Sequence, residues 1–328
     1  MPGAAVILTP MGSGPGMTDG WTERHSFRRL VSLAKWAAAA AVILLAATPG
    51  FAADMEVVAS GLRFPEGTIF VGGTLYFVDY AASDVLRVAH GKVETVWHRD
   101  GCGANGLVEV SGELLVACYD SGTIVGITTE GRVRETIARD DAGGRFVNPN
   151  DLAADSAGGV YFTGSGNAAV AGKVYYRDAA GHVRIVADGI SYANGLAVSN
   201  DGKRLYLAES QKHRLLSFRI GAHGGLSGGA ELVTLANILA DGRHATFTPD
   251  GVRLDKQGRI FVGLYDGGGF AVLTGDGKLI KKVGLPAAHH ANLAISPDGK
   301  SVFVTASDDT PDGSGRGAVF KVDNPVPE

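Results

Sequence analysis

Short apolar runs separated by glycine-rich turns make up the chain from about residue 55 onward. Residues 107–110 and 113–117 are two such runs, and only Ser111-Gly112 stands between them. The same scheme recurs where Asn200-Asp201-Gly202 and Pro297-Asp298-Gly299 precede strand-like runs. Two apolar runs joined by so short a turn are typical of β-hairpins. No stretch of useful length after Ala52 has the period of a helix, so the pattern predicts an all-β fold.

One local pattern recurs at the start of each unit: a carboxylate or amide side chain directly before a glycine or a strand-like run. The steps between successive positions are 39, 45, 44, 56 and 42 residues, and the six residues are Glu66, Asn105, Asn150, Asn194, Asp250 and Asn292. A period near forty residues with several strands per unit is the signature of propeller blades. We therefore predict a six-bladed β-propeller. A seventh blade would have to lie in the 56-residue step, where residues 220–230 fit a long hairpin loop better.

The two ends of the repeat predict how the ring closes. Residues 57–67 align without a gap with residues 185–195, where the strand is the outer edge of the preceding blade. The last unit, residues 289–322, has about three strands and lacks a fourth. The N-terminal strand is thus expected to complete the last blade, which hides edges that would otherwise pair with other chains. We predict one propeller domain over residues 53–328.

The first 52 residues differ from the rest. Basic residues, among them Arg28, Arg29 and Lys35, precede an uninterrupted apolar run at 36–47, and small residues follow as far as Ala52. This order predicts an N-terminal extension and signal peptide over residues 1–52, with cleavage near Ala52 and a periplasmic or secreted protein. A membrane span needs about 20 residues, so we expect no stable membrane insertion after cleavage, although an uncleaved anchor is the alternative. The start could be Met1 or Met17.

Composition excludes one class of partner. The chain has 30 Lys and Arg against 34 Asp and Glu, and 48 glycines. A protein with this balance lacks the basic excess that binds a phosphate backbone, so we expect no nucleic-acid partner. The high glycine content fits many tight turns in an all-β domain.

The six recurring residues are candidates for a metal site. In a propeller, the innermost strands begin at one mouth of the central channel, so residues at their heads converge on one axis. Two carboxylates and four amides, without Cys or His in register, form an oxygen-rich set that suits a divalent cation, Ca²⁺ first. The alternative is that each is a turn residue, because Asn-Gly and Asp-Gly are common in turns. Six in register are harder to explain in this way.

Several motifs resemble the SMP-30/gluconolactonase/LRE-like (regucalcin-type) family over residues 57–322. These motifs are Phe64-Pro65-Glu66-Gly67, Asn148-Pro149-Asn150-Asp151-Leu152, Asn194-Gly195-Leu196 with Asn200-Asp201-Gly202, and Pro249-Asp250-Gly251. The resemblance implies a six-bladed propeller that holds a calcium-type ion through Glu66, Asn150, Asn194 and Asp250. It also implies hydrolysis of lactones, with Asp250 as general base or nucleophile beside a metal that polarises the carbonyl.

The substrate stays open. The vertebrate sugar-lactonase branch of that family has an Arg near the third blade head, where this chain has Asn148. The sugar contacts of that branch therefore do not carry over. We assign substrate binding to Asn105, Asn148, Asn292 and His290, and an apolar rim to Phe64, Tyr192 and Tyr265.

Cys102 and Cys118 are the only cysteines. Export would permit a disulfide between them, but the hairpin register requires Cys102 to curl back to reach its partner, so the sequence leaves this bridge open.

Three functions fit the sequence. The first is an exported, metal-dependent hydrolase that opens a lactone. The second is a related ester or organophosphate hydrolase, because paraoxonases and diisopropyl fluorophosphatase share the architecture. The third is a non-catalytic propeller that binds a partner and is stabilised by its ion.

Overall fold

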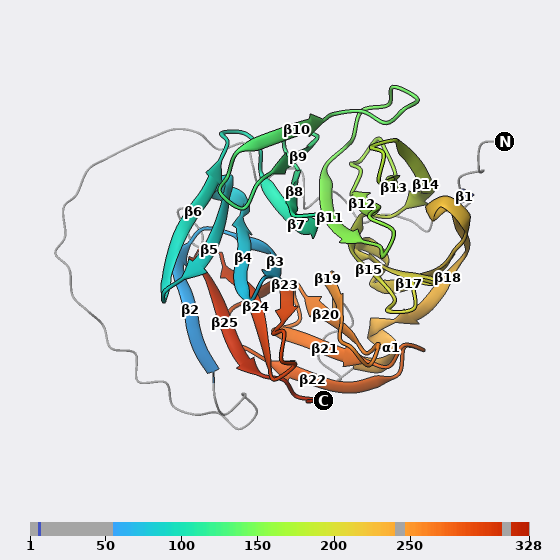
Figure 1. The fold of residues 1–328 in the computed structure, drawn as a ribbon. Coiled ribbons are helices and arrows are strands. Elements are labelled where there is room, and N and C mark those ends of the chain that lie inside the picture. The colour runs from blue at the N-terminus through green and yellow to red at the C-terminus, as the bar shows by residue number, and fades with distance from the viewer. Residues whose placement is uncertain (1–5, 8–54, 240–246, 310–315, 328) are drawn as a thin grey trace. The chain divides into compact units, whose positions relative to one another are not determined.

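The computed structural model describes residues 6–7, 55–239, 247–309 and 316–327. Strands in these residues form six sheets that follow one another around a central axis (Figure 1). This confirms the predicted all-β, six-bladed propeller. The predicted signal peptide lies outside the described residues, apart from Val6 and Ile7.

Blades 1 to 3 take up the first half of the ring, and each runs from its innermost strand outward. Blade 1 consists of β3 (Pro65–Val71), β4 (Thr74–Asp79), β5 (Asp84–Ala89) and β6 (Lys92–His98). Blade 2 consists of β7 (Ala104–Val110), β8 (Glu113–Cys118), β9 (Thr123–Ile127) and β10 (Val133–Ile137). Blade 3 consists of β11 (Pro149–Ala154), β12 (Val160–Gly164), β13 (Gly172–Arg177) and β14 (Val183–Ile190), with β1 (Val6–Ile7) parallel to β14.

Blades 4 to 6 complete the ring. Blade 4 consists of β15 (Ala193–Val198), β16 (Arg204–Glu209), β17 (Arg214–Ile220) and β18 (Leu226–Thr234). Blade 5 consists of β19 (Pro249–Leu254), β20 (Ile260–Leu264), β21 (Gly269–Leu273) and β22 (Leu279–Gly284). Blade 6 consists of β23 (His289–Ile295), β24 (Ser301–Asp308), β25 (Arg316–Asp323) and β2 (Met55–Leu62).

The outermost strand of blade 6 comes from the other end of the domain. β2 pairs antiparallel with β25, with Met55 opposite Val322 and Leu62 opposite Gly317. The predicted closure by the N-terminal strand is thus confirmed. The ring has no open junction between its first and last blades.

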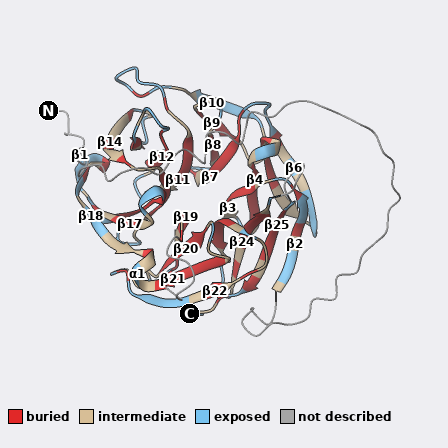
Figure 2. Cartoon of the chain, turned by 180° about the vertical axis from the view of Figure 1, so that it is seen from behind, coloured by how far each residue is buried: buried red, intermediate tan, exposed pale blue. Residues whose placement is uncertain are grey.

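The apolar core lies between neighbouring blades. Between blades 1 and 2, for example, Val78, Leu107 and Val116 are fully buried. Figure 2 shows the same gradient, with buried residues on the inner strands and exposed residues along the outer edges at β2, β10 and β18. Burial of apolar surface between blades is therefore what holds the six sheets together.

Glycines let the inner strands approach one another closely. A Cβ on Gly106 would lie 2.1 Å from the carbonyl oxygen of Asn150 in blade 3, and one on Gly195 would lie 2.2 Å from that of Asp250 in blade 5. No side chain fits at such a distance. The Asn-Gly pairs of the repeat thus serve packing between blades, in addition to whatever their amides bind.

Helices are few and short in the described residues. They are α1 (Leu235–Leu239) and three 3-10 turns, η1 (Tyr80–Ala82), η2 (Ser210–Lys212) and η3 (Ala222–Gly224). None of them is long and apolar enough to cross a membrane. In the 56-residue step, the described residues form the single sheet of blade 4, β15 to β18, and then α1, rather than a seventh sheet.

Cys102 and Cys118 form a disulfide, which answers the question that the sequence left open. Both are fully buried. The bridge ties the segment before β7 to the end of β8, next to the channel mouth.

Candidate functional site

Each innermost strand is irregular at the same place. The pairing of the inner strand with the second strand shifts between Glu66 and Ile69 in blade 1, between Pro149 and Leu152 in blade 3, and between Pro249 and Val252 in blade 5. Blades 2, 4 and 6 have the same shift. An irregularity of this kind re-aims the side chain that it contains. The head residues lie at these irregularities, which is how the repeat turns polar side chains toward the axis.

Five of the six predicted head residues share one position and one degree of burial. Their exposed fractions are 4% for Glu66, 7% for Asn105, 5% for Asn150, 6% for Asn194 and 6% for Asp250. Polar side chains are rarely so buried without a purpose or a partner. We refer to the region at the heads of the inner strands that these five residues mark as the chamber.

The predicted register was wrong in blade 6. Gly251 of blade 5 faces the carbonyl oxygen of Ala291 and the Cα of Asn292, just as Gly195 of blade 4 faces the carbonyl oxygen of Asp250 and the Cα of Gly251. Ala291 is therefore the head of blade 6, and Asn292 lies one residue further along. The Asn292 side chain accepts a hydrogen bond from the amide of Leu293 at 2.9 Å, and 2% of the residue is exposed. Nothing in this arrangement supports the predicted substrate contact of Asn292.

The two carboxylates of the chamber come from blades that are not neighbours. Burial, followed by repulsion from Asp250 and Asp151, raises the pKa of Glu66 well above its usual value. Burial, followed by repulsion from Asp151, raises the pKa of Asp250 as well. Side chains of blades 1 and 5 can act on each other in this way only through the channel. The chamber thus concentrates negative charge where little water reaches it.

Two oxygens in the chamber lack a donor. Glu66 Oε2 and Asn194 Oδ1 are buried and have no hydrogen-bond partner among the described residues. The amide of Asn194 is held in place, because its Nδ2 donates to Ser210 Oγ at 3.1 Å and that hydroxyl donates to the carbonyl oxygen of Pro249 at 2.6 Å. This leaves the amide oxygen for another group.

The donor set fits a divalent cation. In the described ranges, no three His, Cys, Asp or Glu side chains come together as a metal cluster. An ion in the chamber would therefore depend on amide oxygens as well as on Glu66 and Asp250. Carboxylate and amide oxygens are the ligands that Ca²⁺ takes in irregular geometry. The two buried oxygens without a donor are what such a site needs.

Aromatic side chains reach across the mouth above the chamber. The hydroxyls of Tyr119 in blade 2 and Tyr192 in blade 4 are 3.1 Å apart. The ring centroids of Phe64 in blade 1 and Tyr265 in blade 5 are 6.2 Å apart. Neither pair joins neighbouring blades: blade 3 lies between the first two, and blade 6 lies between the second two. Tyr80, which the sequence analysis did not single out, packs edge-on against both Phe64 and Tyr119 and extends this rim.

Asn148 lies beside the rim. It has a left-handed backbone conformation (φ 53°), and a hydrogen bond from its side chain lowers the pKa of Tyr119, although burial raises that pKa more. A neutral amide thus stands at the mouth, in a position to contact a ligand entering between the aromatic rings.

The two adjacent histidines face different surroundings. His290 is fully buried, and its Nε2 donates to the carbonyl oxygen of Pro286 at 2.8 Å. These contacts tie it to the loop between blades 5 and 6, and nothing in them supports the predicted substrate contact. His289 stacks on Tyr265 with ring centroids 4.3 Å apart, and hydrogen bonding to Asp266 raises its pKa. His289 is therefore the histidine of the rim.

An ion pair joins two inner strands beyond the head residues. Nη1 of Arg253 in blade 5 donates to Asp151 Oδ2 at 2.8 Å, and Nη2 donates to Oδ1 at 3.2 Å. Blade 4 separates the blades that carry them, so the pair joins inner strands that are not neighbours. Sequence reasoning missed it, because the partners are 102 residues apart. The only signal was that Asp151 directly follows Asn150 and that Arg253 follows Asp250 by three positions.

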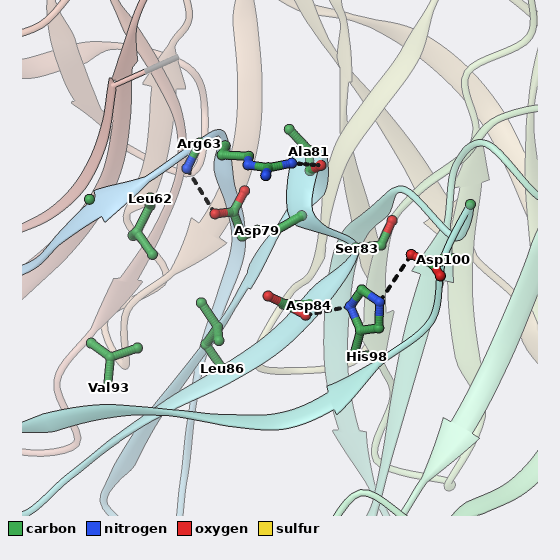
Figure 3. Close-up of a pocket in the computed structure, with 13 residues that line it drawn as sticks. Leu62, Arg63, Asp79, Ala81, Ser83, Asp84, Leu86, Val93, His98 and Asp100 are labelled. Carbon is green, nitrogen blue, oxygen red and sulfur yellow. Dashed lines mark hydrogen bonds and ion pairs between the residues drawn. The ribbon is translucent and has the colours of Figure 1, made fainter. Parts of the chain in front are cut away.

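A separate hollow lies on the flank of blade 1 (Figure 3). Asp79 there accepts hydrogen bonds from the amides of Arg63 and Phe64 at 2.8 and 2.9 Å. His98 lies between Asp84 and Asp100, at 2.7 and 3.1 Å from their carboxylates. The bonds to Asp79 fix the backbone that carries Phe64 to the rim, which is the link between this hollow and the chamber.

Fold and chamber together define a six-bladed propeller with buried carboxylate and amide oxygens on its axis. Residues 64–308 match the model of the SMP-30/gluconolactonase/LRE-like family. The chain belongs to this family.

Relatives and solved structures agree with this assignment. A gluconolactonase of Zymomonas mobilis subsp. mobilis is 29% identical over 77% of this chain and 79% of its own length. The pentonolactonase XacC of Haloferax volcanii is 26% identical over 64% of this chain and 72% of its own. A gluconolactonase of Xanthomonas campestris has a similar fold, with a TM-score of 0.68 at 20% identity over 81% of this chain and 89% of that one. So does a calcium-binding protein, regucalcin, of Agrobacterium tumefaciens, with a TM-score of 0.68 at 19% identity over 84% and 95%.

Proposed function

We propose that this protein is a metal-dependent hydrolase that opens the ring of a lactone in the chamber. The observation that carries the proposal is the convergence of Glu66 and Asp250, two buried carboxylates from blades 1 and 5, with the unpartnered amide oxygen of Asn194. The lactonase names of the two relatives support the substrate class. The regucalcin likeness agrees with Ca²⁺ as the ion.

Glu66, Asn150, Asn194 and Asp250 would hold the ion, with their oxygens as ligands. A bound divalent ion would polarise the lactone carbonyl and stabilise the negative charge that develops on its oxygen. Asn194 is oriented for this role by Ser210, and Asn105 and Asn148 stand where they can contact the rest of the substrate.

Asp250 is the residue to which we assign the chemistry. As a carboxylate, it would accept a proton from the attacking water or attack the carbonyl carbon itself. Burial raises the pKa of Asp250, whereas its hydrogen bond with Asn194 acts in the opposite direction and favours the ionised form. The aromatic rings of Phe64, Tyr192 and Tyr265 would cover the apolar part of the lactone.

We further propose that the protein is exported to the periplasm or secreted. The Cys102–Cys118 disulfide supports this, because such bonds persist in oxidising compartments. The pattern of basic and apolar residues at positions 1–52 also supports export.

Activity on a panel of lactones tests the function. The panel contains sugar lactones and aliphatic γ- and δ-lactones, assayed with a chelator and then with Ca²⁺ restored. We expect turnover that the chelator abolishes and Ca²⁺ restores. No turnover of any lactone by protein with a bound ion would leave the ester hydrolase or the binding propeller in its place.

Asp250→Asn tests the assigned residue. We expect a loss of turnover of about 1,000-fold, because the amide neither accepts the proton nor attacks. Asp298→Asn is the matched control: Asp298 has the same Pro-Asp-Gly neighbours, but it is exposed in a hairpin turn and accepts a hydrogen bond from the Lys300 amide. Full turnover by Asp250→Asn would contradict the assignment.

A further inference from the structure

The Asp151–Arg253 pair is the one charged contact among the described residues that joins innermost strands across the channel. Asp151 lies on β11 and is 1% exposed, while the side chain of Arg253 lies on β19 and is 16% exposed. The two bonds to the carboxylate make the pair bidentate, and Arg253 Nη1 also donates to the carbonyl oxygen of Val252 at 2.8 Å. Asp151 Oδ1 also accepts a hydrogen bond from the amide of Leu152 at 2.9 Å, so backbone groups hold both partners in place.

The pair adjoins the proposed ligands on both sides. Asp151 directly follows Asn150, and Arg253 lies on the same strand as Asp250. The pair is electrostatically coupled to the chamber: Asp151 raises and Arg253 lowers the pKa of both Glu66 and Asp250. A change of charge at this depth is felt strongly, because little water screens it.

The charges near the axis add up in a simple way. In the state that binds an ion, Glu66 and Asp250 would be ionised, so together with Asp151 they bring three carboxylates, and Arg253 brings one guanidinium. Without Arg253, the ion would face three negative charges. Without Asp151, it would face a net charge of one negative charge. With both, two negative charges remain, which equals the charge of one divalent cation.

We propose that the Asp151–Arg253 pair is a positioning element that sets the charge of the chamber to match a divalent cation. The proposal rests on the metal site of the proposed function. In this proposal, the pair does more than fill the channel. If the pair were only a plug that fills the channel, calcium affinity would depend on its shape and hydrogen bonds. If the pair sets the charge, the change in calcium affinity depends on the sign of the charge that remains when one partner is removed.

Calcium affinity of three variants of the full chain separates the two roles, measured by isothermal titration calorimetry. Asp151→Asn leaves a buried positive charge near the ion, and we expect affinity to fall about 10-fold or more. Arg253→Met leaves an extra negative charge, so affinity should stay equal or rise, although the melting temperature in chelator should fall because a buried charge is unpaired. The double variant restores the balance and should bind Ca²⁺ within about 3-fold of the wild type.

Two further variants complete the set. Arg253→Lys keeps the charge and loses the fork, so we expect near wild-type affinity, and this holds even if Arg253→Met fails to fold. Glu135→Gln removes the carboxylate of the Arg177–Glu135 pair, 2.7 Å apart on outer strands, and should leave calcium affinity unchanged.

Weaker binding in both single variants and no recovery in the double variant would overturn the proposal in favour of a plug. So would a large loss of affinity in Arg253→Lys. A wild-type protein that binds no divalent ion would overturn this proposal and the metal site together. A wild-type protein that binds Ca²⁺ but opens no lactone would sink only the proposed function, because calorimetry still reads out the charge balance.

Discussion

Blades 3 and 6 lie opposite each other in the ring and use the same local bonds. In blade 3, the amide of Asp151 donates to Thr163 Oγ1 at 3.0 Å, and the Asp151 side chain accepts from the amide of Leu152 at 2.9 Å. In blade 6, the amide of Asn292 donates to Thr305 Oγ1 at 2.9 Å, and its side chain accepts from the amide of Leu293 at 2.9 Å. All four other blades have glycine at this place, and in one of them threonine follows the glycine.

The two blades nevertheless give different residues to the chamber. Blade 3 presents Asn150 and sends Asp151 to Arg253, whereas blade 6 presents Ala291. The shared Asp or Asn therefore secures the irregular inner strand, and in the proposed site the residue before it decides whether the blade offers a ligand. A polar residue on the inner strand is not by itself a ligand.

Asn150→Ala tests this difference between the blades most directly, because it gives blade 3 an alanine at its head, as in blade 6. We expect calcium affinity to fall about 10-fold or more and lactone turnover about 100-fold, since one oxygen ligand is lost. Calorimetry and the lactone assay measure the two effects. Ala291→Ser, the matched change in blade 6, should alter neither by more than about 2-fold. Equal losses in both variants would mean that the opposite blades contribute alike.

Much of this contrast was open to prediction from the sequence. The repeat, the six blades and their closure follow from patterns that recur within the chain. The register of blade 6 was missed, because Ala291-Asn292-Leu293 looks like the Ala-Asn pairs of other blades. The spacing to the next buried apolar residue indicates the correct register. This apolar residue lies two positions after the head, and in four blades it is Leu107, Leu152, Leu196 or Val252. Two positions before Leu293 is Ala291.

Contacts across the axis could not be predicted in the same way. Asp151 and Arg253, or Tyr119 and Tyr192, belong to blades that are not neighbours, and only the closed ring brings them together. Neither pair has a spacing that a local motif would record. The periodicity of the sequence predicts which residues point to the axis. Which of these residues contact one another depends on the diameter of the channel.

Removal of the threonine hydroxyls tests the shared bonds themselves. Thr163→Val and Thr305→Val each leave a buried backbone amide without an acceptor, so each should lower the free energy of unfolding by about 1–3 kcal/mol. Denaturant unfolding in chelator measures this loss. Only Thr163→Val should also weaken calcium binding, because of these two blades only blade 3 has a proposed ligand beside the irregularity. A comparable loss of calcium affinity in Thr305→Val would contradict the comparison.

The smallest effect concerns the residue before each head, which is Pro149 in blade 3 and His290 in blade 6. Burial lowers the pKa of His290 from 6.5 to about 4. The folded state thus keeps the ring neutral while the unfolded chain takes up a proton, so stability is full above pH 6.5 and is lost as the pH falls toward 4. At about 1.4 kcal/mol per pKa unit, we expect the wild type to lose roughly 1 kcal/mol between pH 7.5 and 5.5 through this residue.

His290→Gln keeps a donor for the carbonyl of Pro286 and removes the titration. Urea unfolding at the two pH values should show a smaller acid-induced loss of stability in this variant than in the wild type. An identical loss would mean that His290 is not held neutral in the folded state.

The closure of blade 6 by β2 also sets an order of events. β2 is the first strand of the propeller, and its partner β25 is the last, so the ring cannot be completed until β25 has been synthesised. A contact between segments so distant costs more chain entropy than any hairpin within a blade, and folds rich in such contacts form slowly. Until β2 and β25 meet, each presents an unpaired edge that another chain could take. The feature that protects the finished ring from aggregation therefore leaves the unfinished chain exposed to it.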